Sequence, residues 1–89
     1  MKAIVTVVGK DRVGIIAEVC VQLASFNINV LDISQTVMQG YFTMMMAVDT
    51  SMSDIPFAEL AKKLDAKGEE MGMSIRLQRE DIFEAMHRV

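Results

Sequence analysis

The order of two apolar periodicities along the 89 residues constrains the fold more than any other feature of this sequence. Alternation with period two is typical of a strand buried on one face, and recurrence every three to four residues is typical of a helix. Strand-like patterns cover residues 2–8, 31–37, 42–48 and 73–79, and helical patterns cover residues 13–26 and 57–71. This order predicts an α+β, ferredoxin-like βαββαβ sandwich, with a four-stranded antiparallel sheet and two helices on one face.

Turn-forming residues separate these segments. Asn27 tolerates the left-handed conformation that ends many helices, and Gly72 is a natural cap for the second helix. Gly40, between two alternating runs, predicts a tight hairpin at Gln39-Gly40 because such turns need positive φ angles. Pro56 suits the first turn of a helix, where its missing N–H costs nothing.

Residues 80–89, "EDIFEAMHRV", predict a short C-terminal helix beyond the main fold. Glu80 and Asp81 suit the N-terminus of that helix, and Arg88 suits its C-terminus. Ile82, Phe83 and Met86 form a narrow apolar stripe. Because an isolated helix of this length is marginal in water, we expect it to dock on its own domain or on a partner subunit.

Composition favours a single domain that pairs with a second copy of itself. Hydrophobic residues make up 52% of the chain, and a small domain cannot hide so much apolar surface alone. The first strand, rich in valine, is expected to be central and covered on both faces. The sheet face opposite the helices should carry Asp32, Ser34, Thr36, Met38, Tyr41, Thr43, Met45, Arg76 and Gln78. This half-apolar face predicts a homodimer, whose contact could run edge to edge or face to face.

Charge and targeting features exclude several classes of partner. The net charge of −3 disfavours direct binding of nucleic acid, which needs a basic surface. No apolar run is long enough to span a membrane. The sequence passes from Met1-Lys2 directly into a strand, without the features of a signal peptide, so the cytoplasm is the expected location.

The patterns of known catalytic and cofactor sites are missing. "GKDRVG" resembles the start of a P-loop, but Ile15 and Ile16 stand where lysine and serine or threonine are required. A dinucleotide fingerprint would need a third glycine. Cys20 is expected in the core, and His87, the single histidine, in the tail, so no nucleophile–base pair is evident. We therefore predict a protein that is not an enzyme, with no metal and no cofactor.

The "GKDRVG" segment is nevertheless a candidate ligand loop. It joins the first strand to the first helix, whose unpaired N–H groups and dipole favour a carboxylate or another anion. Gly14 has no side chain, so a ligand can approach the backbone there. Asp11 could cap the helix or bind an ammonium group, and Lys10 and Arg12 add positive charge. The alternative is a plain turn that caps the helix.

The segment "VVGKDRVGIIAEVCVQLASFNINVLDISQ" resembles the ACT domain, a small-ligand regulatory module with the βαββαβ order inferred above. The resemblance covers about residues 1–79, with residues 80–89 as a helical tail. The chain is most similar to stand-alone ACT proteins of the glycine cleavage repressor type. Val13 stands where the family often has proline. The resemblance implies pairing of domains, with amino acids bound between the first loop of one copy and the second strand of the other. Carried to this sequence, the ligand-binding residues are Asp11, Arg12, Val13, Gly14, Ile15, Asn27, Asn29 and Val30.

Two functions follow from these observations. The first is a regulatory domain that senses an amino acid or similar metabolite at a dimer interface. Because no catalytic domain is attached, its output would go to a separate protein target. The second is an interaction module whose paired sheets dock a partner protein without any ligand.

Overall fold

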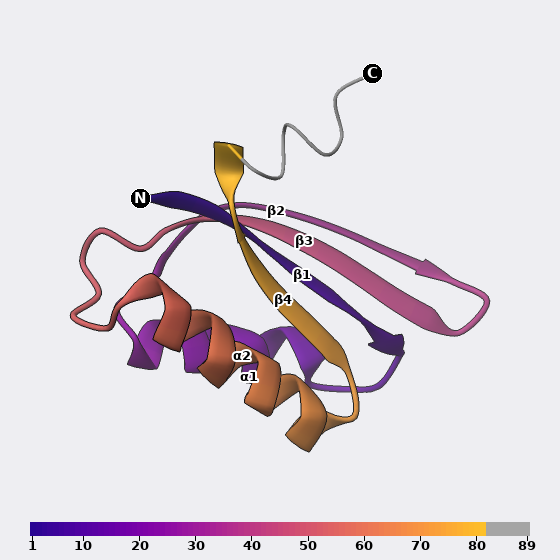
Figure 1. The fold of residues 1–89 in the computed structure, drawn as a ribbon. Helices are drawn as coiled ribbons and strands as arrows, with labels where there is room; N and C mark the ends of the chain where they lie inside the picture. The colour runs from indigo at the N-terminus through magenta and orange to yellow at the C-terminus, as the bar shows by residue number, and fades with distance from the viewer. Residues whose placement is uncertain (82–89) are drawn as a thin grey trace.

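The computed structural model describes residues 1–81 and has the predicted order of elements (Figure 1). The first half contains strand β1 and helix α1, followed by the β2–β3 hairpin, and the second half contains helix α2 and strand β4. Their bounds are β1 Lys2–Lys10, α1 Ile15–Ser25, β2 Asn29–Met38, β3 Tyr41–Asp49, α2 Phe57–Met71 and β4 Ser74–Arg79. The helix predicted for residues 80–89 lies, except for its first two residues, outside the described part of the chain.

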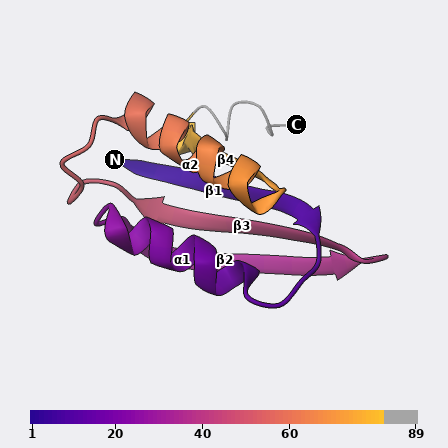
Figure 2. The same ribbon diagram turned by 90° about the horizontal axis from the view of Figure 1, so that it is seen from below.

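The strands form one antiparallel sheet in the order β2-β3-β1-β4. Both helices lie on the same face of this sheet, as Figures 1 and 2 show. The four-stranded ferredoxin-like sandwich predicted from the sequence is therefore confirmed. β2 and β4 are its edge strands, and within residues 1–81 each leaves one side of its backbone without a strand partner.

The core lies between the helices and the helix-facing side of the sheet. α1 contributes Val19 and Leu23, and α2 contributes Leu60 and Leu64, all essentially inaccessible to solvent. The sheet meets them with every second residue of its central strands, because successive side chains of a strand point to opposite faces. These buried strand residues are Ala3, Val5, Val7, Phe42, Met44, Met46 and Val48.

The sheet face opposite the helices is open. The pairing register places all nine residues predicted for this face together on it, and adds Ile4, Thr6 and Val8 of β1. The expectation that β1 is covered on both faces is wrong for the single chain, since Val8 is 41% exposed. β1 is central in the sheet, but both helices pack on the face opposite to Val8, so only that face of the strand is covered.

Three turns behave as their residues predict. Asn27 and Gly72 adopt positive φ angles of 58° and 71° and end the two helices. Gln39 and Gly40 have φ angles of 52° and 81°, the paired positive values of a tight hairpin. Pro56 differs from expectation, because it is the N-cap residue of α2 with an extended ψ of 146° and lies just before the first turn.

Strand β2 departs from the regular alternation predicted for it. Its register with β3 shifts between Val30 and Asp32, so Leu31 is an extra, unpaired residue at a β-bulge. Ile33 and Val37 lie opposite Met46 and Phe42 on the helix-facing side. They are nonetheless 42% and 52% exposed, because β2 is an edge strand with no element beside it.

Candidate functional site

The first loop is shorter than the "GKDRVG" segment suggested. β1 continues through Gly9 and Lys10, so Asp11 to Gly14 alone connect it to α1. The backbone N–H of Asp11 donates a 2.9 Å hydrogen bond to the carbonyl of Gly40, which ties the loop to the β2–β3 turn. This bond fixes the start of the loop against the distal end of the hairpin.

Helix α1 begins two residues later than predicted because of Gly14. Gly14 is the N-cap residue, with a left-handed φ of 91°, and its predicted place inside the helix is wrong. An added Cβ there would meet no atom within 4 Å, so the space beside this backbone is open. The glycine is required by its φ angle, which other residues adopt at a cost.

The N-terminus of α1 has no side-chain cap. The first helical hydrogen bond joins the N–H of Glu18 to the carbonyl of Gly14 at 2.9 Å. The amide groups of Ile15, Ile16 and Ala17 precede this bond and have no carbonyl acceptor within the helix. Asp11 does not cap the helix, so of its two predicted roles only contact with an ammonium group remains.

A hollow of about 240 Å³ lies at this helix end, between the first loop and the hairpin. Four of the predicted ligand residues line it: Asp11, Arg12, Gly14 and Ile15. Val13 does not line it, and its side chain is 98% exposed. The other lining residues, which sequence reasoning missed, are Ile16, Ala17, Gln35, Val37 and Phe42. Gln35, Val37 and Phe42 come from the β2–β3 hairpin, in the regular stretch of its ladder next to the Gln39-Gly40 turn.

The remaining predicted ligand residues lie at the opposite end of α1. Asn27 follows its last turn, while Asn29 and Val30 open β2 opposite Asp49 and Val48. The 11 residues of α1 separate the two groups by about 16 Å. A single chain therefore does not bring Asn27, Asn29 and Val30 to the hollow, and their role across a pair of chains stays a prediction.

Asp49 is the charged group beside that second cluster. Its carboxylate accepts a 3.0 Å hydrogen bond from the N–H of Ser51, which is the main cause of a lowered pKa. The N-terminal ammonium of Met1 lies 3.4 Å from the same carboxylate and lowers the pKa further. Asp49 is therefore ionised and engaged within its own chain at neutral pH.

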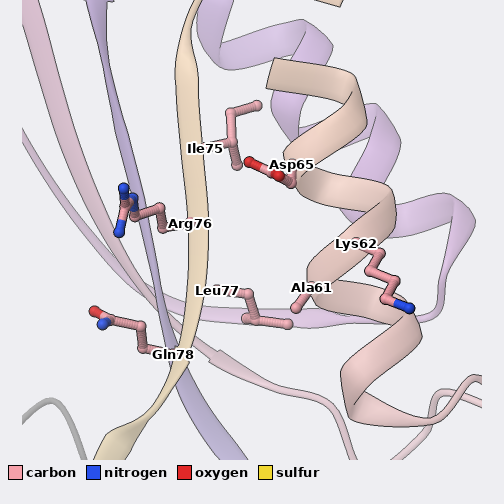
Figure 3. Close-up of a pocket in the computed structure, with 7 residues that line it drawn as sticks. All are labelled: Ala61, Lys62, Asp65, Ile75, Arg76, Leu77 and Gln78. Atoms are coloured by element: carbon pink, nitrogen blue, oxygen red, sulfur yellow. The ribbon is translucent and has the colours of Figure 1, made fainter. Parts of the chain in front are cut away.

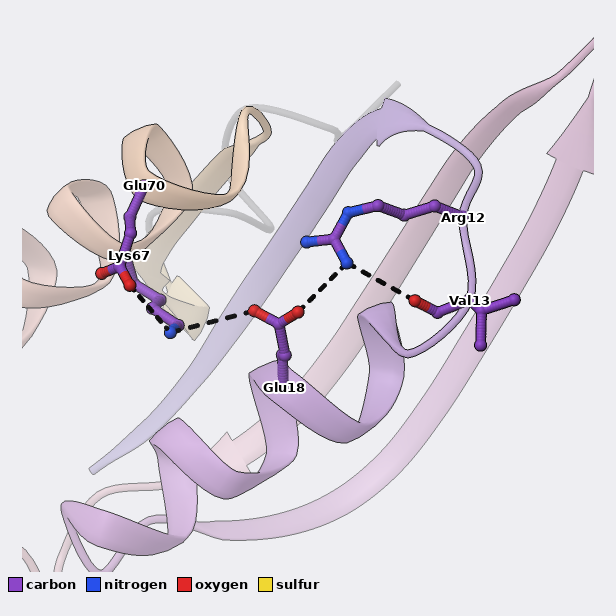
Figure 4. A network of polar contacts seen from close by, with 5 residues as sticks. All are labelled: Arg12, Val13, Glu18, Lys67 and Glu70. Atoms are coloured by element: carbon purple, nitrogen blue, oxygen red, sulfur yellow. Dashed lines mark hydrogen bonds and ion pairs between the residues drawn. The ribbon is translucent and has the colours of Figure 1, made fainter.

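Arg12 is held by an ion-pair network that crosses to the second helix (Figure 4). Its Nη1 donates to Glu18 Oε1 at 3.0 Å and, more weakly, to the carbonyl of Val13 at 3.4 Å. Glu18 Oε2 lies 3.9 Å from Lys67 Nζ, which in turn lies 3.6 Å from Glu70 Oε1. The network links the ligand loop to α1 and α2.

Replacement of Glu18 by glutamine should cost less than about 1 kcal/mol of unfolding free energy, because exposed ion pairs are weak. Glu59→Gln is the matched control, since Glu59 also lies in the first turn of a helix but makes no ion pair within residues 1–81. Urea unfolding at low and at 1 M salt measures the difference, which should shrink with salt. A loss above about 2 kcal/mol would contradict this weak coupling.

Neither a metal cluster nor a membrane span is found in the part of the chain that the structure describes. No group of three His, Cys, Asp or Glu side chains there could hold a metal ion. No helix among residues 1–81 combines the length and apolarity needed to cross a bilayer. Cys20 packs partly buried against the core, as expected.

Comparison with known proteins places the chain in a family. A family model described as the ACT domain matches residues 2–78. A UPF0237 protein of Clostridium acetobutylicum is 56% identical over 89 residues, covering 100% of both chains. An ACT domain protein from Streptococcus pneumoniae has a TM-score of 0.83 and 46% identity, covering 98% of both chains. The chain therefore belongs to the ACT domain family, whose members are in general ligand-binding regulatory domains.

The fold also resembles part of a larger regulator. The structure of a proposed glycine cleavage system transcriptional repressor matches with a TM-score of 0.72 over 86% of this chain and 44% of the other. Identity is 23%, so this likeness concerns the fold alone. The relationship to stand-alone ACT proteins suggested by the first loop and helix is thus confirmed, and the likeness to a repressor of this type is one of fold.

Proposed function

We propose that the protein is a regulatory domain that senses an amino acid or similar small metabolite at an interface between two copies of the chain. The observation that carries this proposal is the hollow at the uncapped N-terminus of α1. It has the size of a small metabolite, free backbone donors at one end and apolar side chains on its walls. The protein acts by binding and not by catalysis.

The donors in the hollow suit a carboxylate. The free amides of Ile15, Ile16 and Ala17 point along the helix axis toward the loop, and the helix dipole adds positive potential there. The open backbone of Gly14 allows an anion to approach closely. Asp11 lines the same hollow and supplies a carboxylate for an ammonium group. An α-amino acid carries both groups, while Ile16 and Val37 offer apolar contact to its side chain.

Edge strand β2 is the better of the two edges for pairing with a second copy. It has ten residues with a single charge, Asp32, whereas β4 has six residues with two arginines. Charged edge strands discourage pairing. Ile16, Leu31, Ile33 and Val37 also leave apolar surface exposed along β2 and the adjoining helix.

Antiparallel pairing of two β2 strands would explain the divided set of ligand residues. In such a pair, the start of one strand lies beside the end of the other. Asn29 of the partner subunit would then lie near Val37 and the hollow, with Asn27 of the partner subunit close by. The amide side chains could meet the polar ends of the ligand. The site would be completed only in the dimer, so ligand binding would favour the dimer. A separate protein target would then respond to the dimer.

A thermal-shift screen with the twenty amino acids tests the proposal. A ligand present at a hundred times its dissociation constant should stabilise the fold by about 2.7 kcal/mol. For a domain of this size, that raises the melting temperature by about 10 °C or more. No shift with any amino acid would instead favour the interaction module, in which the open sheet face docks a partner without a ligand.

Ala17→Glu should weaken amino acid binding while the fold is retained. Ala17 is exposed, lines the hollow and occupies the first turn of α1, where a carboxylate suits the dipole. The new charge repels a ligand carboxylate, weakening binding by roughly tenfold or more. Calorimetric titration with the amino acid found in the screen measures this loss.

Ala17→Gln is the matched control, because it fills a similar volume without charge. We expect it to bind the amino acid more tightly than Ala17→Glu does. Equal affinity in both variants and the parent would place the ligand elsewhere. A substitution at Gly14 would be a poorer probe, since a left-handed φ of 91° strains any side chain there.

A further inference from the structure

A second hollow lies near the opposite edge of the sheet from the ligand loop. It is a groove of about 420 Å³ between α2 and edge strand β4 (Figure 3). Ala61, Lys62 and Asp65 form its helix wall, and Ile75 and Leu77 of β4 face them. Arg76 and Gln78 project from the opposite face of β4, as Figure 3 shows.

The groove is wedge-shaped because α2 approaches β4 closely at one end only. At Gly68 an added Cβ would lie 2.7 Å from the carbonyl oxygen of Met73 and 3.0 Å from the N atom of Ile75. Seven residues earlier on α2, Ala61 is only partly buried beside Leu77. At the open end Ala61 is partly exposed next to the strand edge, while Leu77 and Ile75 are 7% and 1% exposed.

Strand β4 offers backbone hydrogen bonds along this groove. It pairs with β1 on one side, and no strand of the described residues 1–81 lies on the other. In an antiparallel sheet, alternate residues of an edge strand direct their N–H and C=O groups outward. An added strand would rest one set of side chains against Ala61 and Leu77 and would place the other set beside Arg76.

The charges along the groove indicate what such a strand should carry. Arg76 is exposed and makes no ion pair within residues 1–81. On the helix wall, Lys62 and Asp65 offset each other, so the net charge along the groove comes from Arg76. Opposite charges on neighbouring strands attract, and like charges repel. The side chains that share a face with Arg76 are therefore best matched by carboxylates, and those facing Ala61 and Leu77 by apolar groups.

We propose that β4 and its groove bind an extended segment of another protein as a fifth strand, with apolar and acidic residues in alternation. Docking of another protein on this surface would be a function in addition to ligand sensing. It lies at the opposite edge of the sheet from β2, so both edges could be occupied at once. The groove would give the regulatory domain a place to hold the protein that it regulates.

The first test uses an acetylated and amidated hexapeptide of alternating valine and glutamate, matched in length to the six residues of β4. Its binding to the full-length chain is measured by fluorescence anisotropy, and the contact is located by amide NMR signals. The signals of residues 74–79 should shift, and those of β2 should not. The same peptide with lysine in place of glutamate should bind about tenfold more weakly.

The decisive variant is Arg76→Glu, which should reverse this preference and bind the lysine peptide about tenfold more tightly than the glutamate peptide. Arg76 is exposed, so the variant should fold. Thr36→Glu places the same charge on the other edge strand and should leave the preference unchanged. Failure of the glutamate peptide to bind, or equal weakening of both peptides by Arg76→Glu, would overturn the proposal.

The docking proposal would also be overturned if either of two other segments occupied the groove. If removal of residues 82–89 raised peptide affinity tenfold, the groove would belong to the C-terminal residues of this chain. If peptide binding weakened as protein concentration rose, a second copy would be pairing through β4. These outcomes concern the groove alone. The amino acid screen tests the ligand hollow independently.

Discussion

Replacement of Ile33 by glutamate should separate the proposed dimer into monomers. Ile33 lies inside the stretch of β2 that would pair with its counterpart, and it is 42% exposed in the single chain. The variant would bring one carboxylate from each copy into an apolar contact, where buried and unpaired charges are costly. We expect the dissociation constant to rise by roughly a hundredfold or more, measured by analytical ultracentrifugation over a concentration series.

Thr43→Glu is the control that distinguishes the two possible dimers. Thr43 lies on central strand β3, on the open face of the sheet. In an edge-to-edge dimer through β2, this variant should associate like the parent. If Thr43→Glu yields monomers and Ile33→Glu does not, the copies pair face to face. A parent protein that is monomeric at tens of micromolar, a typical range for subunit association, would remove the dimer from the proposal.

The fold was largely predictable because its signals are local. Alternation in β3 and β4, the helical stripe of α2 and the turn residues Asn27, Gly40 and Gly72 each constrain a few residues directly. The order of elements then leaves few topologies. Where the prediction was wrong, the structure depends on a backbone angle or on a contact between residues far apart in the sequence. Gly14 shortens α1 through its φ angle, and only one face of β1 is covered because both helices pack on that same face.

The candidate site was predictable only in part. The loop and helix start were evident from Asp11 to Ile15, because consecutive residues build them. Gln35, Val37 and Phe42 were not predicted, since their place beside the first loop depends on a contact between that loop and the β2–β3 hairpin, which lie far apart in the sequence. The bulge at Leu31 was also missed, because a bulge is a two-strand feature and the sequence of one strand carries little signal for it.

The tight end of the α2–β4 wedge rests on Gly68, and Gly68→Ala tests whether packing or helix propensity dominates there. Alanine is favoured over glycine within a helix by about 1 kcal/mol, so propensity alone would stabilise the variant. The new Cβ would instead meet backbone atoms of Met73 and Ile75, at 2.7 Å and 3.0 Å, and backbone yields less readily than a flexible side chain. Overpacking of this kind costs about 1–3 kcal/mol.

We therefore expect Gly68→Ala to lose about 2 kcal/mol of unfolding free energy and to lower the melting temperature by about 10 °C. Ala66→Gly on the exposed flank of the same helix is the control, and its loss of about 1 kcal/mol would reflect propensity alone. Denaturant unfolding measures whether Gly68→Ala lowers or raises the unfolding free energy, and this sign decides the question. A more stable variant would mean that α2 can move away from β4 at little cost, and that the closed end of the groove is adjustable. A less stable variant would mean that Gly68 fixes α2 against β4. The closed end of the groove could then not move, and the open end would keep its width.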